Sequence, residues 1–280
     1  MRPRPGVLSG PALLVLPLAL AHLMLFAAPL LLLAATSFAA DETLHAFSLR
    51  AWTDLFGDPF NWRALANTMK LGLLTVLATS CLAIPLALVH MAAGPLLRRV
   101  ILIAAVLPLL TSVVVRSFAW IAILGRDGVL STVLQATGLA SGPVQLLQTE
   151  PGLILALAQI EMPLILLPLM SSLGRLDPAL LDASAVSGAS LARTLRRVVL
   201  PAALPGLVAG GSLAFASSST AFISQSIIGG GRLVYLPALV WQQSMLTFDW
   251  PLAAAIALLL MVAVLLVVSL AGRLGRGAHA

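Results

Sequence analysis

Long apolar stretches recur along the whole of this 280-residue chain, and they constrain its fold more than any other feature. Six reach the roughly 20 residues that a helix needs to cross the hydrocarbon core of a bilayer. They run approximately over residues 11–38, 66–90, 97–124, 151–173, 203–228 and 251–272. Only 9% of the residues are charged, against roughly a quarter in soluble domains. We therefore expect an all-α polytopic membrane protein with six transmembrane helices and a single domain, 1–280.

The first apolar stretch follows Arg2 and Arg4 and contains no charged residue before Asp41. It has two interpretations, an uncleaved first span or a secretory signal that ends near the small residues 37–40. The apolar region of a signal peptide is typically about 7–15 residues long. Because this stretch is about twice as long, the uncleaved span is the preferred interpretation.

The arginines predict the orientation of the spans, because Lys and Arg accumulate on the cytoplasmic side. With the N-terminus inside, the inner segments hold ten arginines and the outer ones four: Arg2, Arg4, Arg98, Arg99, Arg175, Arg193, Arg196, Arg197, Arg273 and Arg276 against Arg50, Arg63, Arg126 and Arg232. Both termini are therefore expected to be cytoplasmic. The basic residues that give the net charge of +6 lie mostly at the edges of apolar runs. That placement indicates a lipid membrane rather than nucleic acid as the partner.

The segment between spans four and five, about 175–205, has strong helix signals. Asp177 followed by Pro178 predicts an N-cap and first helical residue, and Gly188 predicts the end of a short helix near residue 187. Ser190 then starts a second helix, which we expect to end near Leu200 before two prolines, Pro201 and Pro205. The pattern alone leaves two alternatives open. One is a loop with interfacial helices that joins two spans. The other is a projecting element that offers small residues to a partner: Ala183, Ser184, Ala185 and Ala189.

A family resemblance favours the second alternative. Asp182-Ala183-Ser184, then Gly188, then Val198 and Leu200-Pro201 resembles the EAA loop of ABC importer permeases in its spacing, although Asp182, Ser184 and Val198 replace the usual Glu, Ala and Ile. The resemblance implies the type I importer permease fold and a loop that docks on a separate ATPase. The coupling-loop residues that it implies are Asp182, Ala183, Ser184, Gly188, Ala189, Ser190, Leu200 and Pro201.

Residues 108–131 and 248–255 are similar to segments of the spermidine/putrescine-type permease subfamily. This resemblance implies a polyamine-like solute. Many members carry an acid near the end of span five, where this chain has Ala221-Phe222. Other small organic cations, amino-acid derivatives and organophosphonates therefore stay open as substrates.

The same resemblance implies the other components of the transporter. The chain is expected to be a transport subunit, not an enzyme, in a bacterial inner membrane, and to work by alternating access. Its partners would be ABC ATPase subunits, a second permease subunit that is either a related chain or a copy of this one, and an extracytoplasmic substrate-binding protein. No cofactor is expected in this chain, since ATP and Mg²⁺ would bind the ATPase. Consistent with this, the chain has no phosphate loop, and its single lysine, Lys70, precedes Leu71. The four histidines are too scattered for a metal site.

Polar residues within the spans are candidates for a substrate pathway, because charge at membrane depth is costly and usually faces protein or water. Glu161 in span four has two interpretations, a pathway ligand for a cation or a partner of Arg116 or a neighbouring helix. The hydroxyl-rich span five likewise either packs against other helices or forms a polar translocation surface. The candidate pathway residues are Glu161, Arg116, Ser218, Thr220 and Gln225.

Two rival functions remain open at this point. A secondary transporter or channel would have inverted repeats with broken helices at matching places, and no convincing repeat is present. An intramembrane enzyme would need a paired catalytic constellation, which the sequence does not contain.

Overall fold

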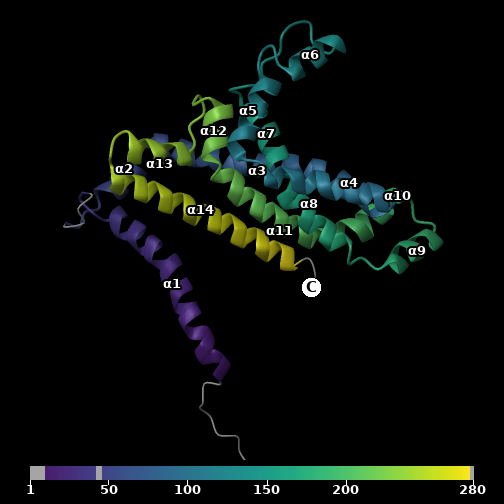
Figure 1. Ribbon diagram of the computed structural model, residues 1–280, viewed down its shortest axis with the longest axis horizontal. Coiled ribbons are helices and arrows are strands. Elements are labelled where there is room, and N and C mark those ends of the chain that lie inside the picture. Colours follow the sequence, from purple (N-terminus) through teal and green to yellow (C-terminus); the bar gives the residue numbers. More distant parts are fainter. Residues whose placement is uncertain (1–9, 42–45, 278–280) are drawn as a thin grey trace, which may run out of the picture. The chain divides into compact units, whose positions relative to one another are not determined.

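The computed structural model describes residues 10–41 and 46–277. Arg2, Arg4 and Glu42 lie outside the described residues. The described chain consists of helices, connecting segments and one isolated bridge between Ala39 and Phe47 (Figure 1). The elements are α1 (Gly10–Ser37), α2 (Arg50–Gly57), α3 (Pro59–Ala92), α4 (Pro95–Val106), η1 (Leu107–Leu110), α5 (Val113–Leu124), α6 (Val129–Ala136), α7 (Glu150–Ile160), α8 (Met162–Leu173), α9 (Pro178–Val186), α10 (Leu191–Thr194), η2 (Leu195–Val199), α11 (Leu200–Ser219), α12 (Phe222–Gly229), α13 (Leu236–Met245) and α14 (Trp250–Gly277).

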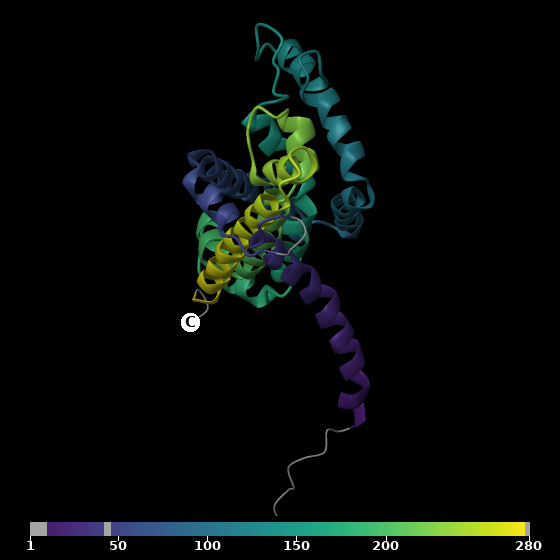
Figure 2. The same cartoon turned by 90° about the vertical axis from the view of Figure 1, so that its left-hand side faces the viewer.

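Within the described residues, four helices are long and apolar enough to cross a membrane: Leu16–Ser37, Pro59–Ala92, Leu191–Ser219 and Trp250–Arg273. Two bent pairs meet the same criterion together. Pro95–Leu110 and Val113–Ala136 meet at 107°, and the turn is visible in Figures 1 and 2. Glu150–Ile160 and Met162–Leu173 meet at 48°. The described residues therefore contain up to six spans. Each overlaps a predicted apolar stretch, but the fifth, Leu191–Ser219, begins and ends earlier than the predicted 203–228.

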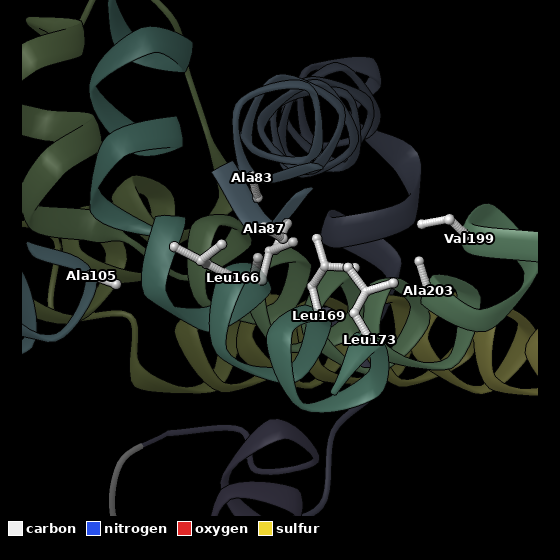
Figure 3. Close-up of a cluster of buried hydrophobic side chains, with 10 residues drawn as sticks. Ala83, Ala87, Ala105, Leu166, Leu169, Leu173, Val199 and Ala203 are labelled. Atoms are coloured by element: carbon white, nitrogen blue, oxygen red, sulfur yellow. The ribbon is translucent and has the colours of Figure 1, made fainter. Parts of the chain in front are cut away.

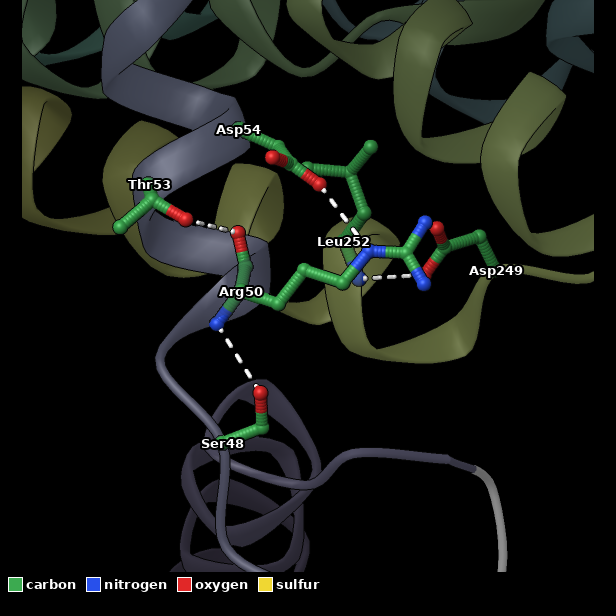
Figure 4. A network of polar contacts seen from close by, with 6 residues as sticks. All are labelled: Ser48, Arg50, Thr53, Asp54, Asp249 and Leu252. Carbon is green, nitrogen blue, oxygen red and sulfur yellow. Dashed lines mark hydrogen bonds and ion pairs between the residues drawn. The ribbon is translucent and has the colours of Figure 1, made fainter.

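The chain divides into two compact units, and the first comprises Met1–Asp58 and Val240–Leu259. In this unit the Nε atom of Arg50 lies 3.3 Å from Asp54 one turn later in α2 (Figure 4). Both side chains are at least half exposed, so this ion pair contributes little stability. Asp249 accepts a hydrogen bond from the backbone N–H of Leu252 and thereby caps the start of α14.

The second unit, Pro59–Leu239 and Leu260–Ala280, is built on three packed helices, α3, α8 and α11. Their contact buries mainly alanine and leucine side chains, several of which Figure 3 shows between the helices. Gly206 and Gly210 of α11 bring its backbone against α8: a Cβ atom on Gly210 would lie only 2.7 Å from Ile165 Cα. Small residues spaced four apart allow this close approach between membrane helices.

Two details of the predicted spans are wrong. The helix that begins after Ser190 does not end at Pro201 or Pro205 but continues to Ser219. Residues 195–199 form a π-helix, η2, in which the Leu200 N–H bonds to the Leu195 carbonyl. This wider turn accommodates the Pro201 ring, so the helix continues through Pro201 without a break. The predicted span 203–228 is instead broken, since α11 ends at Ser219 and α12 begins at Phe222.

Candidate functional site

Three helix breaks in the second unit surround one cavity of about 620 Å³. The chain breaks between η1 and α5, between α7 and α8, and between α11 and α12. Residues beside all three breaks line the cavity: Leu109, Val113, Arg116, Ile160, Glu161, Leu164, Ser217, Thr220, Ala221, Phe222, Ile223 and Ser224. Non-helical backbone at membrane depth is tolerated only where it is buried in protein or lines a water-filled cavity. The breaks therefore mark the candidate functional site.

The backbone differs at the three breaks. Thr111 and Ser112 adopt extended conformations directly after the short 3₁₀ helix that contains Pro108. Glu161 closes α7 and precedes α8, whose first turn contains Pro163. The third break has no proline: Ala221 leaves the helical region with φ −74° and ψ 58°.

Gln225 stabilises the third break from the side of α12. Its Nε2 atom donates hydrogen bonds of 3.0 and 3.5 Å to the carbonyls of Ser218 and Ser219, at the C-terminal end of α11. Both Gln225 and Ser218 are buried and lie outside the cavity lining. Thr220, in contrast, is exposed in this chain and lines the cavity. The structure thus separates the five candidate pathway residues into three that line the cavity and two that join α11 to α12.

Glu161 is the buried acid of the cavity. It is only 3% exposed, and its Oε1 atom accepts a 2.9 Å hydrogen bond from the Ser217 hydroxyl on α11. The candidate set did not include Ser217. A signal was available in the sequence, because Ser217, Thr220 and Ser224 are spaced three and four residues apart and would share one face of the continuous helix that was predicted over 203–228.

Arg116 lies across the same cavity on α5. Its Nε and Nη1 atoms are buried, and no group in residues 10–41 and 46–277 accepts a hydrogen bond from either. Within the same ranges no ion pair joins Arg116 to Glu161 at 4.0 Å or less. The cavity therefore presents one acidic and one basic group that do not neutralise each other by direct contact.

The predicted coupling loop is the second candidate site. Asp177 Oδ1 accepts a hydrogen bond from the Ala179 N–H at the start of α9, as predicted. Gly188 has φ +66°, the Gly188 N–H bonds to the Ala185 carbonyl, and the Ala189 N–H bonds to the Ser184 carbonyl. These two bonds form the Schellman motif that ends a helix with a left-handed glycine.

The predicted coupling loop is also tied to the long apolar helices. Leu181 of α9 and Leu195 of η2 pack against the buried cluster formed by α3, α8 and α11. The Ser184 and Thr194 hydroxyls lie 2.6 Å apart and join α9 to α10. The other side of the loop is exposed. Val186 of α9 is 90% exposed and Leu191 of α10 is 76% exposed.

The remaining coupling-loop residues lie where the loop meets α11. Ser190 precedes α10 and its side chain makes no capping bond there, while Leu200 and Pro201 begin α11. Asp182 and Ala183 are exposed and Ala189 is partly buried. In the part of the chain that the structure describes, no group of three or more His, Cys, Asp or Glu side chains is placed to hold a metal ion.

Comparison with known proteins gives a consistent family match. Residues 82–279 match the family described as "Binding-protein-dependent transport system inner membrane component". The spermidine/putrescine transport system permease protein PotB of Haemophilus influenzae is 28% identical over 234 residues, which cover 82% of each chain. The putative 2-aminoethylphosphonate transport system permease protein PhnU of Salmonella choleraesuis is 31% identical over 201 residues, which cover 70% of this chain and 69% of the relative.

The fold is similar to that of a solved ABC transporter chain. The crystal structure is that of a bacterial ABC transporter involved in the import of the acidic polysaccharide alginate. The TM-score is 0.77 at 18% sequence identity, and the similarity covers 94% of this chain and 93% of that chain. At this identity the comparison supports the fold alone.

Proposed function

Since this chain belongs to the family of binding-protein-dependent transport inner-membrane components, we propose that its broken-helix cavity is part of the translocation pathway of an ATP-driven importer. The chain is the multi-pass inner-membrane permease component of an ABC transporter, and the ATPase is a separate subunit. ABC transporters of this family assemble with an ATPase and a substrate-binding protein. The observation that carries the proposal is the convergence of three helix breaks on a cavity lined by Glu161, Arg116 and Thr220.

The coupling loop transmits movement from the ATPase in this proposal. Helix α9 docks on the ATPase through its exposed residues, and Asp182 and Ala183 are part of that surface. Leu181 and Leu195 carry the movement to α3, α8 and α11, because they pack against the core of these helices. ATP binding and release then switch the cavity between the two sides of the membrane, provided that ATP and the loaded binding protein favour different conformations.

A second permease subunit, either a related chain or a second copy, completes the pathway. In this arrangement both termini are cytoplasmic, which places the arginine-rich coupling loop beside the ATPase. ATP and Mg²⁺ bind the ATPase partner. Ser218 and Gln225 support the pathway from behind the lining, since they hold α11 and α12 together at the third break.

The proposed solute is a small organic molecule that carries an amine. Two features support a polyamine-like compound: the relative named as a spermidine/putrescine permease, and the buried acid Glu161 in the cavity. An aminophosphonate is the second candidate. It is supported by the relative named as a putative 2-aminoethylphosphonate permease and by the basic group of Arg116 in the same cavity.

Reconstitution tests the proposed function. The chain would be purified with its ATPase and second permease, placed in proteoliposomes and supplied with the binding protein. Uptake of radiolabelled putrescine and 2-aminoethylphosphonate would be measured with ATP and with ADP. ATP-dependent uptake of either solute that also needs the binding protein is the expected result. Equal accumulation with ATP and ADP, or without the binding protein, would contradict the assignment.

A further inference from the structure

We propose that the cavity at the three helix breaks binds a solute that carries an anionic group as well as an amine. Arg116 binds the anionic group, a carboxylate or a phosphonate, and Glu161 binds the amine. The inference rests on the proposed function, because it assumes that this cavity is part of the pathway. It narrows the substrate class from organic amines in general to small zwitterions.

Two nitrogen donors of Arg116 have no hydrogen-bond partner among the described residues. An arginine side chain has five N–H donors in a planar fork and no acceptor. In the described ranges 10–41 and 46–277, Nε and Nη1 of Arg116 are buried and no acceptor reaches them. The Arg116 residue as a whole is only partly buried, but leaving buried donors without an acceptor is costly. A carboxylate or phosphonate would satisfy this fork with paired hydrogen bonds.

Glu161 is held in place at the wall of the same cavity. Ser217 donates to Oε1 and thereby holds the carboxyl group at the cavity wall, beside the break between α7 and α8. No ion pair of 4.0 Å or less joins Glu161 to Arg116 within the described part of the chain. Neither group is therefore neutralised by the other, and both line the cavity, although the Arg116 side chain must turn for its buried Nε and Nη1 to reach a ligand there. The cavity of about 620 Å³ has the size of a small-molecule site.

The charge of Arg116 also argues against a simple diamine. A second ammonium group close to the guanidinium would be repelled by it, because like charges at short range disfavour each other. Replacing that ammonium with a carboxylate turns the repulsion into attraction. The cavity should therefore discriminate between four-carbon compounds that differ only in the charge of one end.

Such a matched set of probes exists. Putrescine carries an amine at both ends, 4-aminobutyrate an amine and a carboxylate, and succinate a carboxylate at both ends; 2-aminoethylphosphonate adds the phosphonate case. Binding would be measured with radiolabelled probes on the detergent-purified complex of both permeases and the ATPase. Leaving out the binding protein removes its own selectivity. The variants are Arg116→Gln, Arg116→Lys and Glu161→Gln, and the control is Arg126→Gln, which removes an exposed positive charge outside the cavity lining.

The wild-type complex should bind 4-aminobutyrate or 2-aminoethylphosphonate roughly tenfold or more tightly than putrescine and succinate. Arg116→Gln should abolish that preference, Arg116→Lys should weaken it because the fork is lost, and Arg126→Gln should leave it unchanged. Glu161→Gln should weaken zwitterion binding but not succinate binding. If Arg116→Gln prevents assembly, Arg116→Lys is compared with the wild type instead. A weaker preference for the zwitterions over putrescine and succinate in Arg116→Lys then supports the inference.

Two results would overturn the inference. One is that putrescine binds at least as tightly as the zwitterions and that the substitutions of Arg116 leave its binding unchanged. The other is an equal loss of all probes in the Arg116 variants, which indicates a structural role or a counter-charge from the second permease. In either case ATP-dependent uptake of putrescine by the wild type would leave the proposed function intact. Failure of the proposed function is distinguishable, because the wild type would then show no ATP-dependent uptake of any probe.

Discussion

The Ser217 hydroxyl donates a 2.9 Å hydrogen bond to Oε1 of Glu161 and so joins the end of α11 to the break between α7 and α8. Glu161 is the residue at which α7 stops and α8 starts, and Ser217 lies two residues before the end of α11. One bond thereby links two of the three breaks around the cavity. It also sets the position of the buried acid that we propose to contact the solute.

Replacing Ser217 with alanine should destabilise the purified protein by roughly 1 kcal/mol, the usual size of a hydrogen bond between membrane helices. Ser212→Ala is the matched control. It lies on the same helix, but its hydroxyl bonds only to the Val208 carbonyl one turn earlier. Unfolding in mixed detergent micelles measures the difference. Equal stabilities for the two variants would mean that the bond to Glu161 contributes nothing.

Gly210 and Gly211 should respond differently to alanine. A Cβ atom at Gly210 would lie 2.7 Å from backbone atoms of α8, whereas one at Gly211 would lie 3.3 Å from the movable side-chain carbon Val76 Cγ1. Overpacking against rigid backbone typically costs about 1–3 kcal/mol. Gly210→Ala should therefore lower the unfolding midpoint, and Gly211→Ala should leave it nearly unchanged. Similar midpoints for both variants would argue against the close contact of α8 and α11.

The left-handed backbone at Gly188 predicts a graded loss of coupling. Asn tolerates a positive φ better than most residues, while a β-branched residue is strained there. Gly188→Asn should retain most ATP-driven uptake, and Gly188→Val should lose most of it while the complex still assembles. Uptake in proteoliposomes and co-purification of the ATPase measure the two properties. Normal uptake in Gly188→Val would remove the loop from the coupling pathway.

Gln225→Glu should destabilise the break between α11 and α12. The new carboxyl group keeps the shape of the side chain, but it has no donor when ionised and only one O–H when protonated, whereas the amide NH₂ reaches both the Ser218 and the Ser219 carbonyl. Leaving a buried carbonyl unsatisfied costs about 1–3 kcal/mol. Gln242→Glu makes the same chemical change at an exposed position and should have little effect. Thermal unfolding of both variants tests the comparison, and a stable Gln225→Glu protein would contradict this role.

The parts of the fold that depend on neighbouring residues could be predicted from sequence. The cap at Asp177 and the left-handed turn at Gly188 are local features, and both are present as expected. The apolar stretches likewise indicated where the spans lie, since length and composition decide whether a helix can cross a membrane.

The breaks could not be predicted in the same way. The end of α11 has no proline, and its free carbonyls are satisfied by Gln225, six and seven residues away along the chain. Conversely, Pro201 looked like the end of a helix, but the π-turn of η2 carries the helix through it. The cavity brings together residues from α5, α8 and α11, so the proximity of Arg116 and Glu161 is a tertiary property.

The reactivity of a cysteine placed in the cavity tests directly whether the cavity belongs to a pathway with alternating access. In a Cys81→Ser background, Thr220→Cys introduces a thiol in the lining, and Leu77→Cys introduces one on an exposed apolar face of α3. Labelling by a charged, membrane-impermeant thiol reagent would be followed in the complete transporter, with and without ATP.

If the cavity is part of the pathway, Thr220→Cys should react, ATP should change its labelling rate by roughly tenfold, and labelling should block uptake. Leu77→Cys should stay unreactive in both states, because a charged reagent does not enter the lipid. A Thr220→Cys protein that resists labelling in both states, or that transports normally after labelling, would contradict the account.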